Sequence, residues 1–198
     1  IAAIRSYIQD VLEDLPQNSP LEDRLKKAEH ATQRCKRIIS DLLTFSRQET
    51  LKQSCNINKV IQQTVSLAKK ELALPELVFE TEFDEQISEI MLDPLQIQQV
   101  LMNLINNAKD AMDGKGIIKV KSFKNENDIS IEVIDQGHGI SQENLAKLFD
   151  PFFTTKAPGK GMGLGLALSY NIIKRYNGDI KVESQPDQGS HFTITLPL

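Results

Sequence analysis

Four glycines alternate with other residues in the stretch GKGMGLGL, from Gly159 to Leu166. The residues that follow, Ala167 to Lys174, have the apolar spacing of an amphipathic helix, which Asn177-Gly178 would end. Glycine lets the backbone approach a ligand closely, and the first turn of a helix presents unpaired N–H groups and a partial positive charge. The stretch therefore predicts a loop that binds a phosphate chain. A plain hinge or helix cap is the alternative, because neither GxxxxGK[ST] nor GxGxxG after a strand is present.

Composition limits the classes of partner. Hydrophobic residues make up 40% of the 198 residues, which is enough for a core in one medium domain or two small ones. The net charge is -4 and basic residues are scattered among acids, so no nucleic-acid partner is expected. No apolar run approaches the roughly 18 residues that cross a bilayer, and the start resembles no signal peptide. Cys35 and Cys55 lack metal-site spacing. We expect a cytoplasmic location, with any membrane anchor lying outside this sequence.

Two helices are predicted within residues 1–52. Apolar residues recur at three-four spacing from Ile1 to Leu15, and a turn over residues 16–20 follows. Ser19 and Glu22 form the pattern of a capping box at the start of the second helix. Its apolar seam lies at positions 21, 25, 28, 32, 35, 39 and 42. We expect this hairpin to pair with a second copy as a four-helix bundle, in a homodimer. Packing on the downstream domain in a monomer is the alternative.

Residues 53–198 combine helices with strands. Helical patterns run from Asn56 to Leu72 and, after Asp93-Pro94, from Leu95 to Met112. Strands are expected at 78–83, 90–92, 117–123, 129–134, 180–184 and 192–196. Because helices and strands are mixed rather than strictly alternating, we expect an α+β sandwich with helices on one face of a mixed sheet.

Two asparagines on the long helix indicate a cation site. Asn103 and Asn107 are four positions apart, so they share one helix face, with Asn106 and Asp110 close by. Both amide oxygens could reach one cation. Mg²⁺ is the plausible ion, since it takes oxygen ligands and shares its other positions with water and nucleotide phosphates. The alternative is a solvated face, although the flanking apolar residues favour a helix drawn into the core.

A carboxylate follows the strand predicted at 129–134. Asp135 is succeeded by Gly137 and Gly139 in a DxGxG pattern. An acid at a strand end suits recognition of an exocyclic amine, and glycines let a flat base approach the backbone. The pattern predicts a base pocket, with a simple turn as the alternative.

Aromatic and basic residues lead into the glycine stretch. Residues 149–156 read FDPFFTTK and have neither helical nor strand periodicity. The phenylalanines indicate a hydrophobic anchor at one end of a movable lid, and Lys156 and Lys160 are placed to contact phosphates as point charges. A solvated charged loop is the alternative.

Together, the order and spacing of these four segments resemble the ATP-binding domain of sensor histidine kinases, in the superfamily of gyrase, Hsp90, histidine kinases and MutL. Residues 103–112 match NLxxNAxDAM and are similar to nitrogen-regulation kinases, and residues 42–47, LLTFSR, resemble the end of a second dimerisation helix. The resemblance covers essentially the whole chain. It implies a histidine kinase core that uses ATP and Mg²⁺, forms a homodimer and passes phosphoryl groups to a response-regulator receiver domain.

The same resemblance assigns site residues. Asn107 would bind Mg²⁺, Asn103 and Lys156 would act on the phosphate side as catalytic residues, and Asp135 would bind the adenine amine. Gly137 and Gly139 would lie beside the base, and Phe149 and Phe152 would anchor the lid. The other nucleotide-binding residues carried over are Thr155, Lys160, Gly161, Met162, Gly163, Leu164, Gly165 and Leu166. Many such kinases have a basic residue where this chain has Asp110, so we expect Lys156 or Lys160 to supply that charge.

The residue four positions before Asn107 separates kinase from hydrolase. ATPases of the superfamily have a water-activating glutamate there, whereas this chain has Asn103. An amide is no general base, which favours transfer to a histidine over hydrolysis. None of His30, His138 and His191 lies in the HExxNP-type motif of family phosphoacceptors, so we expect the acceptor a few residues upstream of Ile1, with His30 as a weaker candidate. A binding module without transfer and a lid-closing ATPase are the competing functions.

Overall fold

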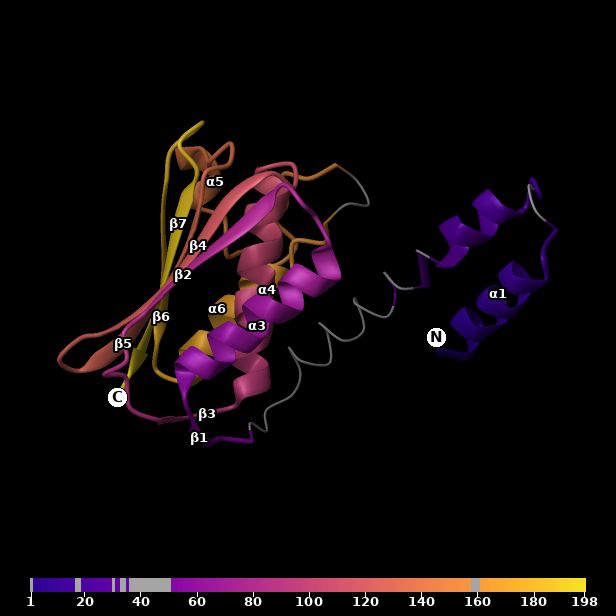
Figure 1. Cartoon of the computed structure of the whole chain (residues 1–198). Coiled ribbons are helices and arrows are strands. Elements are labelled where there is room, and N and C mark those ends of the chain that lie inside the picture. The colour runs from indigo at the N-terminus through magenta and orange to yellow at the C-terminus, as the bar shows by residue number, and fades with distance from the viewer. Residues whose placement is uncertain (1, 17–18, 30, 33–34, 36–50, 158–160) are drawn as a thin grey trace. The chain divides into compact units, whose positions relative to one another are not determined.

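The structure is a computed structural model that describes residues 2–16, 19–29, 31–32, 35, 51–157 and 161–198 (Figure 1). The chain divides into two compact units, Ile1–Arg47 and Gln48–Leu198. The boundary expected between residues 52 and 53 remains a prediction. Seam positions 39 and 42, the LLTFSR segment, His30 and Lys160 lie outside the described residues.

Unit Ile1–Arg47 contains helix α1 (Ala2–Asp14) and a second helical stretch at 22–29. The predicted capping box is only half made. Ser19 Oγ accepts the backbone N–H of Leu21 at 3.3 Å, whereas the Glu22 carboxylate pairs with Lys26 at 2.6 Å and does not return to the cap. No residue of α1 is buried in this chain. Among the described residues of this unit, the large apolar side chains that are exposed are Ile4, Tyr7, Val11 and Leu21. The bundle of two copies therefore remains a prediction, with an uncovered apolar stripe in its favour.

Unit Gln48–Leu198 is built on a five-stranded sheet with the order β2-β4-β5-β7-β6. Strands β2 and β4 are parallel, and the other neighbours are antiparallel. The strands are β2 (Leu77–Phe83), β4 (Gly116–Lys124), β5 (Asp128–Asp135), β6 (Asp179–Ser184) and β7 (Ser190–Pro197). The three long helices are α3 (Ile57–Leu72), α4 (Pro94–Ala111) and α6 (Gly165–Arg175), which cover one face of the sheet (Figure 1). The predicted α+β class with a mixed sheet is confirmed.

Two short elements were not expected from the sequence. Strand β1 (Gln53–Cys55) pairs antiparallel with β3 (Ile90–Leu92), and α5 (Gln142–Leu145) is a single helical turn. Both are too short to show a periodic pattern of apolar residues, which is the signal on which such predictions depend.

Helix starts follow from local chemistry. The side chain of Asn56 accepts the N–H of Lys59 at the start of α3. At α4, Asp93 accepts the N–H of Leu95 at 3.0 Å, and Pro94 occupies the first turn, where its missing N–H has no cost. These caps fix where each helix enters the core.

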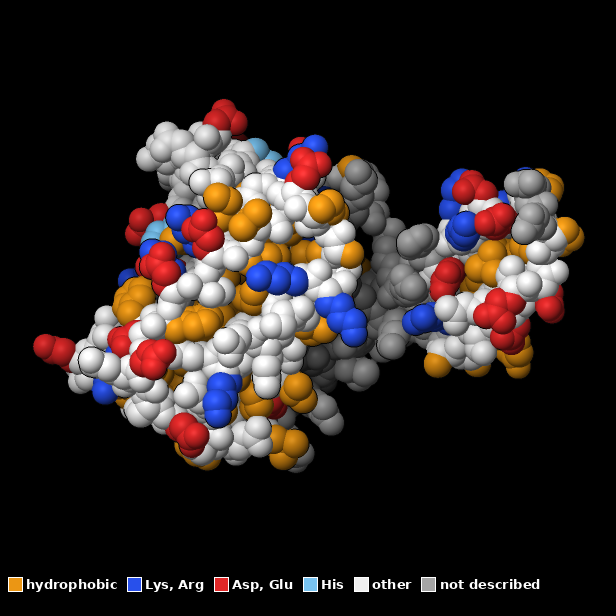
Figure 2. Space-filling view, in the orientation of Figure 1, with side chains coloured by type: hydrophobic (Ala, Val, Ile, Leu, Met, Phe, Trp, Pro, Cys, Tyr) orange, Lys and Arg blue, Asp and Glu red, His pale blue; other side chains and the backbone are white. Residues whose placement is uncertain are grey.

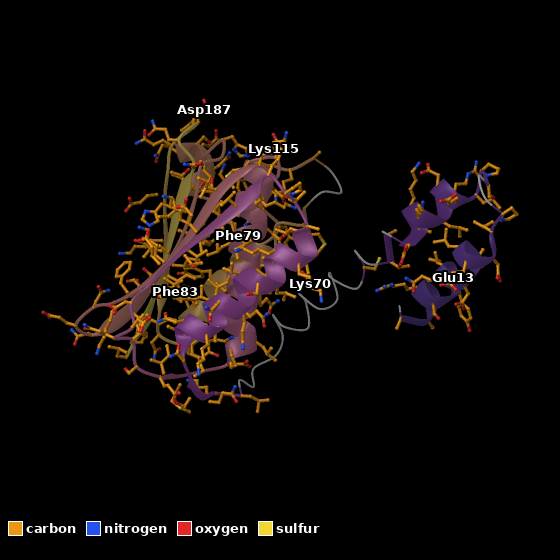
Figure 3. All side chains as sticks on the ribbon, in the orientation of Figure 1. Glu13, Lys70, Phe79, Phe83, Lys115 and Asp187 are labelled. Atoms are coloured by element: carbon orange, nitrogen blue, oxygen red, sulfur yellow. The ribbon has the colours of Figure 1, made fainter. Side chains whose placement is uncertain are left out.

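The core lies between the helices and one face of the sheet. Its largest fully buried side chains come from all three helices and from β4 and β5: Ile57, Ile61, Ile97, Leu101, Leu104, Ile105, Ile118, Ile129, Ile131, Leu168, Ile172 and Ile173. Each such side chain contributes about 1.5–3 kcal/mol relative to exposure. On edge strand β2, Phe79 and Phe83 (Figure 3) are partly buried and pack against this core. The buried helical faces leave the opposite faces of α4 and α6 free to carry polar residues.

Tyr176, at the C-terminal end of α6, links two helices of the site. Its hydroxyl accepts the backbone N–H of Asp93 at 3.0 Å and donates to Oε1 of Gln96 at 3.2 Å. The ring is 6% exposed. One side chain therefore ties the end of α6 to the N-terminal cap of α4.

We expect Tyr176→Phe to lower the free energy of unfolding by about 1–2 kcal/mol, because the Asp93 N–H and the Gln96 oxygen lose their partner in a buried place. Urea denaturation would measure it. Tyr170→Phe, on the same helix, is the control and should change the value by less than about 0.5 kcal/mol, since Tyr170 is only partly buried and the ring that contacts the ammonium of exposed Lys174 is kept. Equal effects of the two substitutions would contradict the prediction.

Candidate nucleotide site

Asp135 ends β5 in a buried position. The residue is 5% exposed, and its Oδ1 accepts the backbone N–H of Gly137 at 2.8 Å. Burial raises the pKa of Asp135, although hydrogen bonds from Gly137 and Ser190 act in the opposite direction. Ser190 is the register partner of Asp135 on β7. A buried acid held by backbone donors is a fixed acceptor for a ligand N–H.

The glycines that follow Asp135 are required by the protein itself. A Cβ at Gly137 would lie 2.6 Å from Cβ of Ala111, and one at Gly139, where φ is +67°, would lie 1.9 Å from the carbonyl oxygen of Gln185. The backbone of this loop also pairs with α4, because the N–H of His138 donates to the carbonyl of Ala111 at 3.1 Å. We predicted glycines that make room for a base. The space that a Cβ would fill at the two positions is occupied by α4 and by the β6–β7 turn, where Figure 3 labels Asp187, and the expectation that these glycines lie beside a base remains a prediction.

Asn103 connects α4 with the start of α6. Its Nδ2 donates to the carbonyl of Gly165 at 3.1 Å and to Oγ of Ser169 at 3.3 Å. Ser169 is fully buried and also donates to the Gly165 carbonyl at 2.9 Å. Sequence reasoning missed Ser169, for which the only signal was a small polar residue on the buried face of a helix. The nitrogen of Asn103 thus fixes the glycine loop, and its oxygen remains for a ligand.

Asn107 presents its oxygen to a cation. Oδ1 of Asn107 accepts from Nζ of Lys156 at 3.2 Å, and the same ammonium is 2.6 Å from Oδ2 of Asp110. The contact shows that this amide oxygen is accessible and oriented toward positive charge, as a Mg²⁺ ligand must be. The residues present therefore fit a divalent cation bound beside them.

Helix α6 begins without a side-chain cap. Leu164 occupies the cap position and makes no side-chain hydrogen bond there. The first N–H groups of a helix have no partner within it, so an anion can take them. Gly163, with φ of +67°, accepts the N–H of Phe152 through its carbonyl at 2.9 Å, which ties the glycine loop to the preceding segment. The arrangement leaves backbone N–H groups open to phosphate oxygens.

The aromatic residues before the loop divide into two kinds. Phe149 packs on Tyr170 with ring centroids 5.3 Å apart, as an anchor should. Phe152 is 69% exposed, with φ of +69°, so it is not a packed anchor in this structure. Its backbone, rather than its ring, holds the segment to Gly163. The other candidates are partly buried Met162, Leu166 and Gly161 and exposed Thr155.

The segments predicted to form one site meet along α4. Asn103 contacts the start of α6, Asn107 and Asp110 contact Lys156, and Ala111 contacts the loop after Asp135. The described parts of these segments therefore lie beside one another along α4.

Residues 92–198, just over half of the chain, match the family described as histidine kinase-, DNA gyrase B-, and HSP90-like ATPase. The chain belongs to this family. Its relatives in the family include the signal transduction histidine-protein kinase AtoS of Escherichia coli K12, 34% identical over 200 residues, which cover 100% of this chain and 32% of AtoS. The sensor histidine kinase ZraS of the same organism is 36% identical over 166 residues, or 83% of this chain and 35% of ZraS. The chain thus spans about a third of these relatives, and the resemblance to sensor histidine kinases is confirmed.

Solved structures of this ATPase family agree with the fold. The catalytic domain of the histidine kinase ThkA is 31% identical, with a TM-score of 0.66 over 74% of this chain and 95% of that domain. ThkA in complex with the response regulator TrrA matches 98% of this chain and 56% of that one, with 26% identity and a TM-score of 0.73. Among the described residues, no helix is long and apolar enough to span a membrane.

Proposed function

We propose that this chain is the ATP-dependent core of a protein-histidine kinase in a two-component system. It transfers the γ-phosphoryl group of ATP to a histidine, from which the group passes to an aspartate of a response-regulator receiver domain. The observation that carries the proposal is that the loop after Asp135, the side chain of Lys156 and the start of α6 all contact α4, which also bears Asn107. The relatives named sensor histidine kinases and the complex of ThkA with its response regulator support both steps.

The residues divide the work of holding ATP. Asp135 accepts the adenine amine, and the N–H groups at the start of α6 donate to phosphate oxygens. Asn107 supplies an oxygen to Mg²⁺, which neutralises phosphate charge when bound. Lys156 supplies the cationic side chain that Asp110 does not. Positioning and charge compensation are what phosphoryl transfer requires from a protein.

Asn103 favours transfer over hydrolysis. Its amide has no basic site to take a proton from water, and its nitrogen is already engaged with Gly165 and Ser169. An imidazole presented in line is itself a nucleophile and needs no such base. The site therefore suits a histidine acceptor, which we place upstream of Ile1.

A labelling experiment tests the proposal. The chain, and a version extended upstream through the native sequence, would each be incubated with γ-labelled ATP and Mg²⁺. Acid-labile, base-stable label on the extended form alone is the expected result. Release of free phosphate by both forms would indicate an ATPase, and nucleotide binding without transfer or release would indicate a regulatory module; either result would overturn the kinase assignment.

The homodimer is part of this proposal and follows from the exposed apolar residues of the first unit, Ile4, Tyr7, Val11 and Leu21. Such a stripe is buried when two hairpins form a four-helix bundle. A sedimentation mass of twice 22.3 kDa is expected. A monomer at all concentrations would contradict the bundle.

Figure 2 shows acidic and basic side chains interspersed over the visible face, as suits a partner protein better than a nucleic acid. A cytoplasmic location belongs to the same proposal.

We expect Asn107→Asp to weaken Mg-ATP binding about tenfold, or about 1.4 kcal/mol. The new carboxylate would hold the Lys156 ammonium and repel phosphates, so the protein gains less affinity when Mg²⁺ is added. Titration calorimetry with and without Mg²⁺ measures this. Asn106→Asp is the control, since successive residues face different sides of a helix, and should change affinity less than twofold. Equal Mg²⁺ dependence in both variants would contradict the assignment of Asn107.

A further inference from the structure

Asp110 lies between two ammonium groups. Its Oδ1 is 2.7 Å from Nζ of Lys109, and its Oδ2 is 2.6 Å from Nζ of Lys156. Burial of Asp110 raises its pKa, but the hydrogen bonds from Lys109 and Lys156 outweigh burial, and the pKa lies below its usual value. Lys109 is on the same helix, whereas Lys156 comes from the segment before the glycine loop. Asp110 is therefore the charged attachment between that segment and α4.

While it is attached to Asp110, Lys156 also occupies Oδ1 of Asn107, the oxygen that the proposed function assigns to Mg²⁺. Lys156 donates to Oδ1 of Asn107 at 3.2 Å while it pairs with Asp110. A Mg²⁺ ligand lies about 2.0–2.1 Å from the ion, and an ammonium on the same oxygen would be repelled by that ion. Lys156 must leave Asn107 before the cation binds there.

We propose that Asp110 is a positioning residue that holds Lys156 against Asn107 in the nucleotide-free chain, so that Mg-ATP must displace an internal cation to enter. Asp110 then competes with the phosphates for the same lysine. The inference deepens the proposed function, on which it rests. The proposal also explains why an acid occupies position 110, although the negative charge of Asp110 by itself opposes phosphate binding.

The expected change in Mg-ATP affinity depends on how far the pair of Lys156 and Asp110 is exposed to solvent. The side chains of Lys156 and Asp110 are 34% and 35% exposed, so solvent screens the pair. Partly exposed pairs of this kind change an equilibrium by about two- to fivefold. Asp110→Asn should therefore tighten Mg-ATP binding by about two- to fivefold, and added salt should reduce the difference between this variant and the unchanged protein.

The first measurement needs no nucleotide. An acylating reagent would label amines in the free protein, with labelling of Lys156 measured by mass spectrometry relative to Lys121, which pairs with Glu82 on the sheet. Asp110→Asn should raise labelling of Lys156 about two- to fivefold, because its ammonium loses its charged partner. Lys109→Met is the matched control: it removes the other cation on the same carboxylate and should not raise labelling of Lys156.

The second measurement tests whether Asp110 acts through its contact with Lys156 or through the repulsion between its own charge and the phosphates. Mg-ATP affinity would be measured by calorimetry for Asp110→Asn, Lys156→Met and the double variant. If Asp110 acts through Lys156, the gain from Asp110→Asn vanishes when Lys156 is methionine. An equal gain in both backgrounds, a loss of affinity in Asp110→Asn, or unchanged labelling of Lys156 would overturn the proposal. If the unchanged protein binds no Mg-ATP, the proposed function fails, while the labelling result still decides whether Asp110 holds Lys156.

Discussion

Asp135→Asn is expected to weaken ATP binding by about a hundredfold or more and, at the same time, to stabilise the nucleotide-free domain. The affinity loss follows from the site, where Asp135 is buried and is the acid we assign to the adenine amine. Hydrogen bonds to charged groups contribute about 1.5–3 kcal/mol, and the asparagine NH₂ would face the amine of the base as a second donor. Titration calorimetry with Mg-ATP gives the affinity.

The gain in stability follows from the sign of the pKa shift. Burial raises the pKa of Asp135 in the folded chain. The folded state then binds more protons than the unfolded state between the two pKa values, so the free energy of unfolding decreases as pH rises through that range. Above the folded pKa the charge destabilises the free domain, and asparagine removes this cost. Below the unfolded value of about 3.9, Asp135 is protonated in both states and the advantage of asparagine disappears.

Denaturation of the unchanged protein and of Asp135→Asn at several pH values checks the predicted direction of the stability difference. The variant should be more stable at neutral pH, by a margin that shrinks as pH falls. Asp187→Asn is the control because Asp187 is exposed on the β6–β7 turn, at φ of +62°, which asparagine also tolerates. It should alter neither ATP affinity nor the pH profile. Normal ATP affinity in Asp135→Asn would falsify the base pocket.

The sequence predicted the elements well where a pattern and a start signal coincide. Helix α4 begins at Pro94, within the Asp93-Pro94 pair after which the sequence predicted a helix, and strands β5 and β7 have the expected one-sided burial. The same signals placed Asn103 and Asn107 on one face of one helix, and both are engaged there with other parts of the site. Order along the chain was sufficient because one of the four segments is α4 itself and the other three contact it.

Contacts between segments could not be predicted from spacing. Ala111 fills the space beside Gly137, and the backbone of Gln185 fills that beside Gly139, so these glycines serve packing between elements distant in sequence. Phe152 follows the aromatic pattern of an anchor, but the structure places it at φ of +69° with its side chain exposed. The pair of Asp110 with Lys156 joins residues 46 positions apart. Each of these depends on tertiary packing, which periodicity does not encode.

Gly163→Ala is the second substitution with a large expected effect. Gly163 has φ of +67°, and a Cβ there would lie 2.3 Å from the carbonyl carbon of Phe152 and 2.3 Å from the carbonyl oxygen of Phe153. Both neighbours are backbone atoms, which cannot turn aside as a side chain can. The hydrogen bond from the Phe152 N–H to the Gly163 carbonyl must therefore break, and the loop before α6 must move. We expect Mg-ATP affinity to fall by about a hundredfold, since left-handed strain and lost loop geometry together cost about 2–3 kcal/mol.

Gly165→Ala, two residues further on, is the matched control. A Cβ at Gly165 would meet Cγ of Asn103 at 3.5 Å, an ordinary contact, and the residue is the first of α6, where alanine is favoured. This variant should keep ATP affinity within about threefold. The free energy of unfolding of Gly163→Ala should fall by less than its loss of binding energy, because the loop can move without exposing the core. Equal ATP affinities for the two alanine variants would mean that the backbone at Gly163 does not shape the phosphate site.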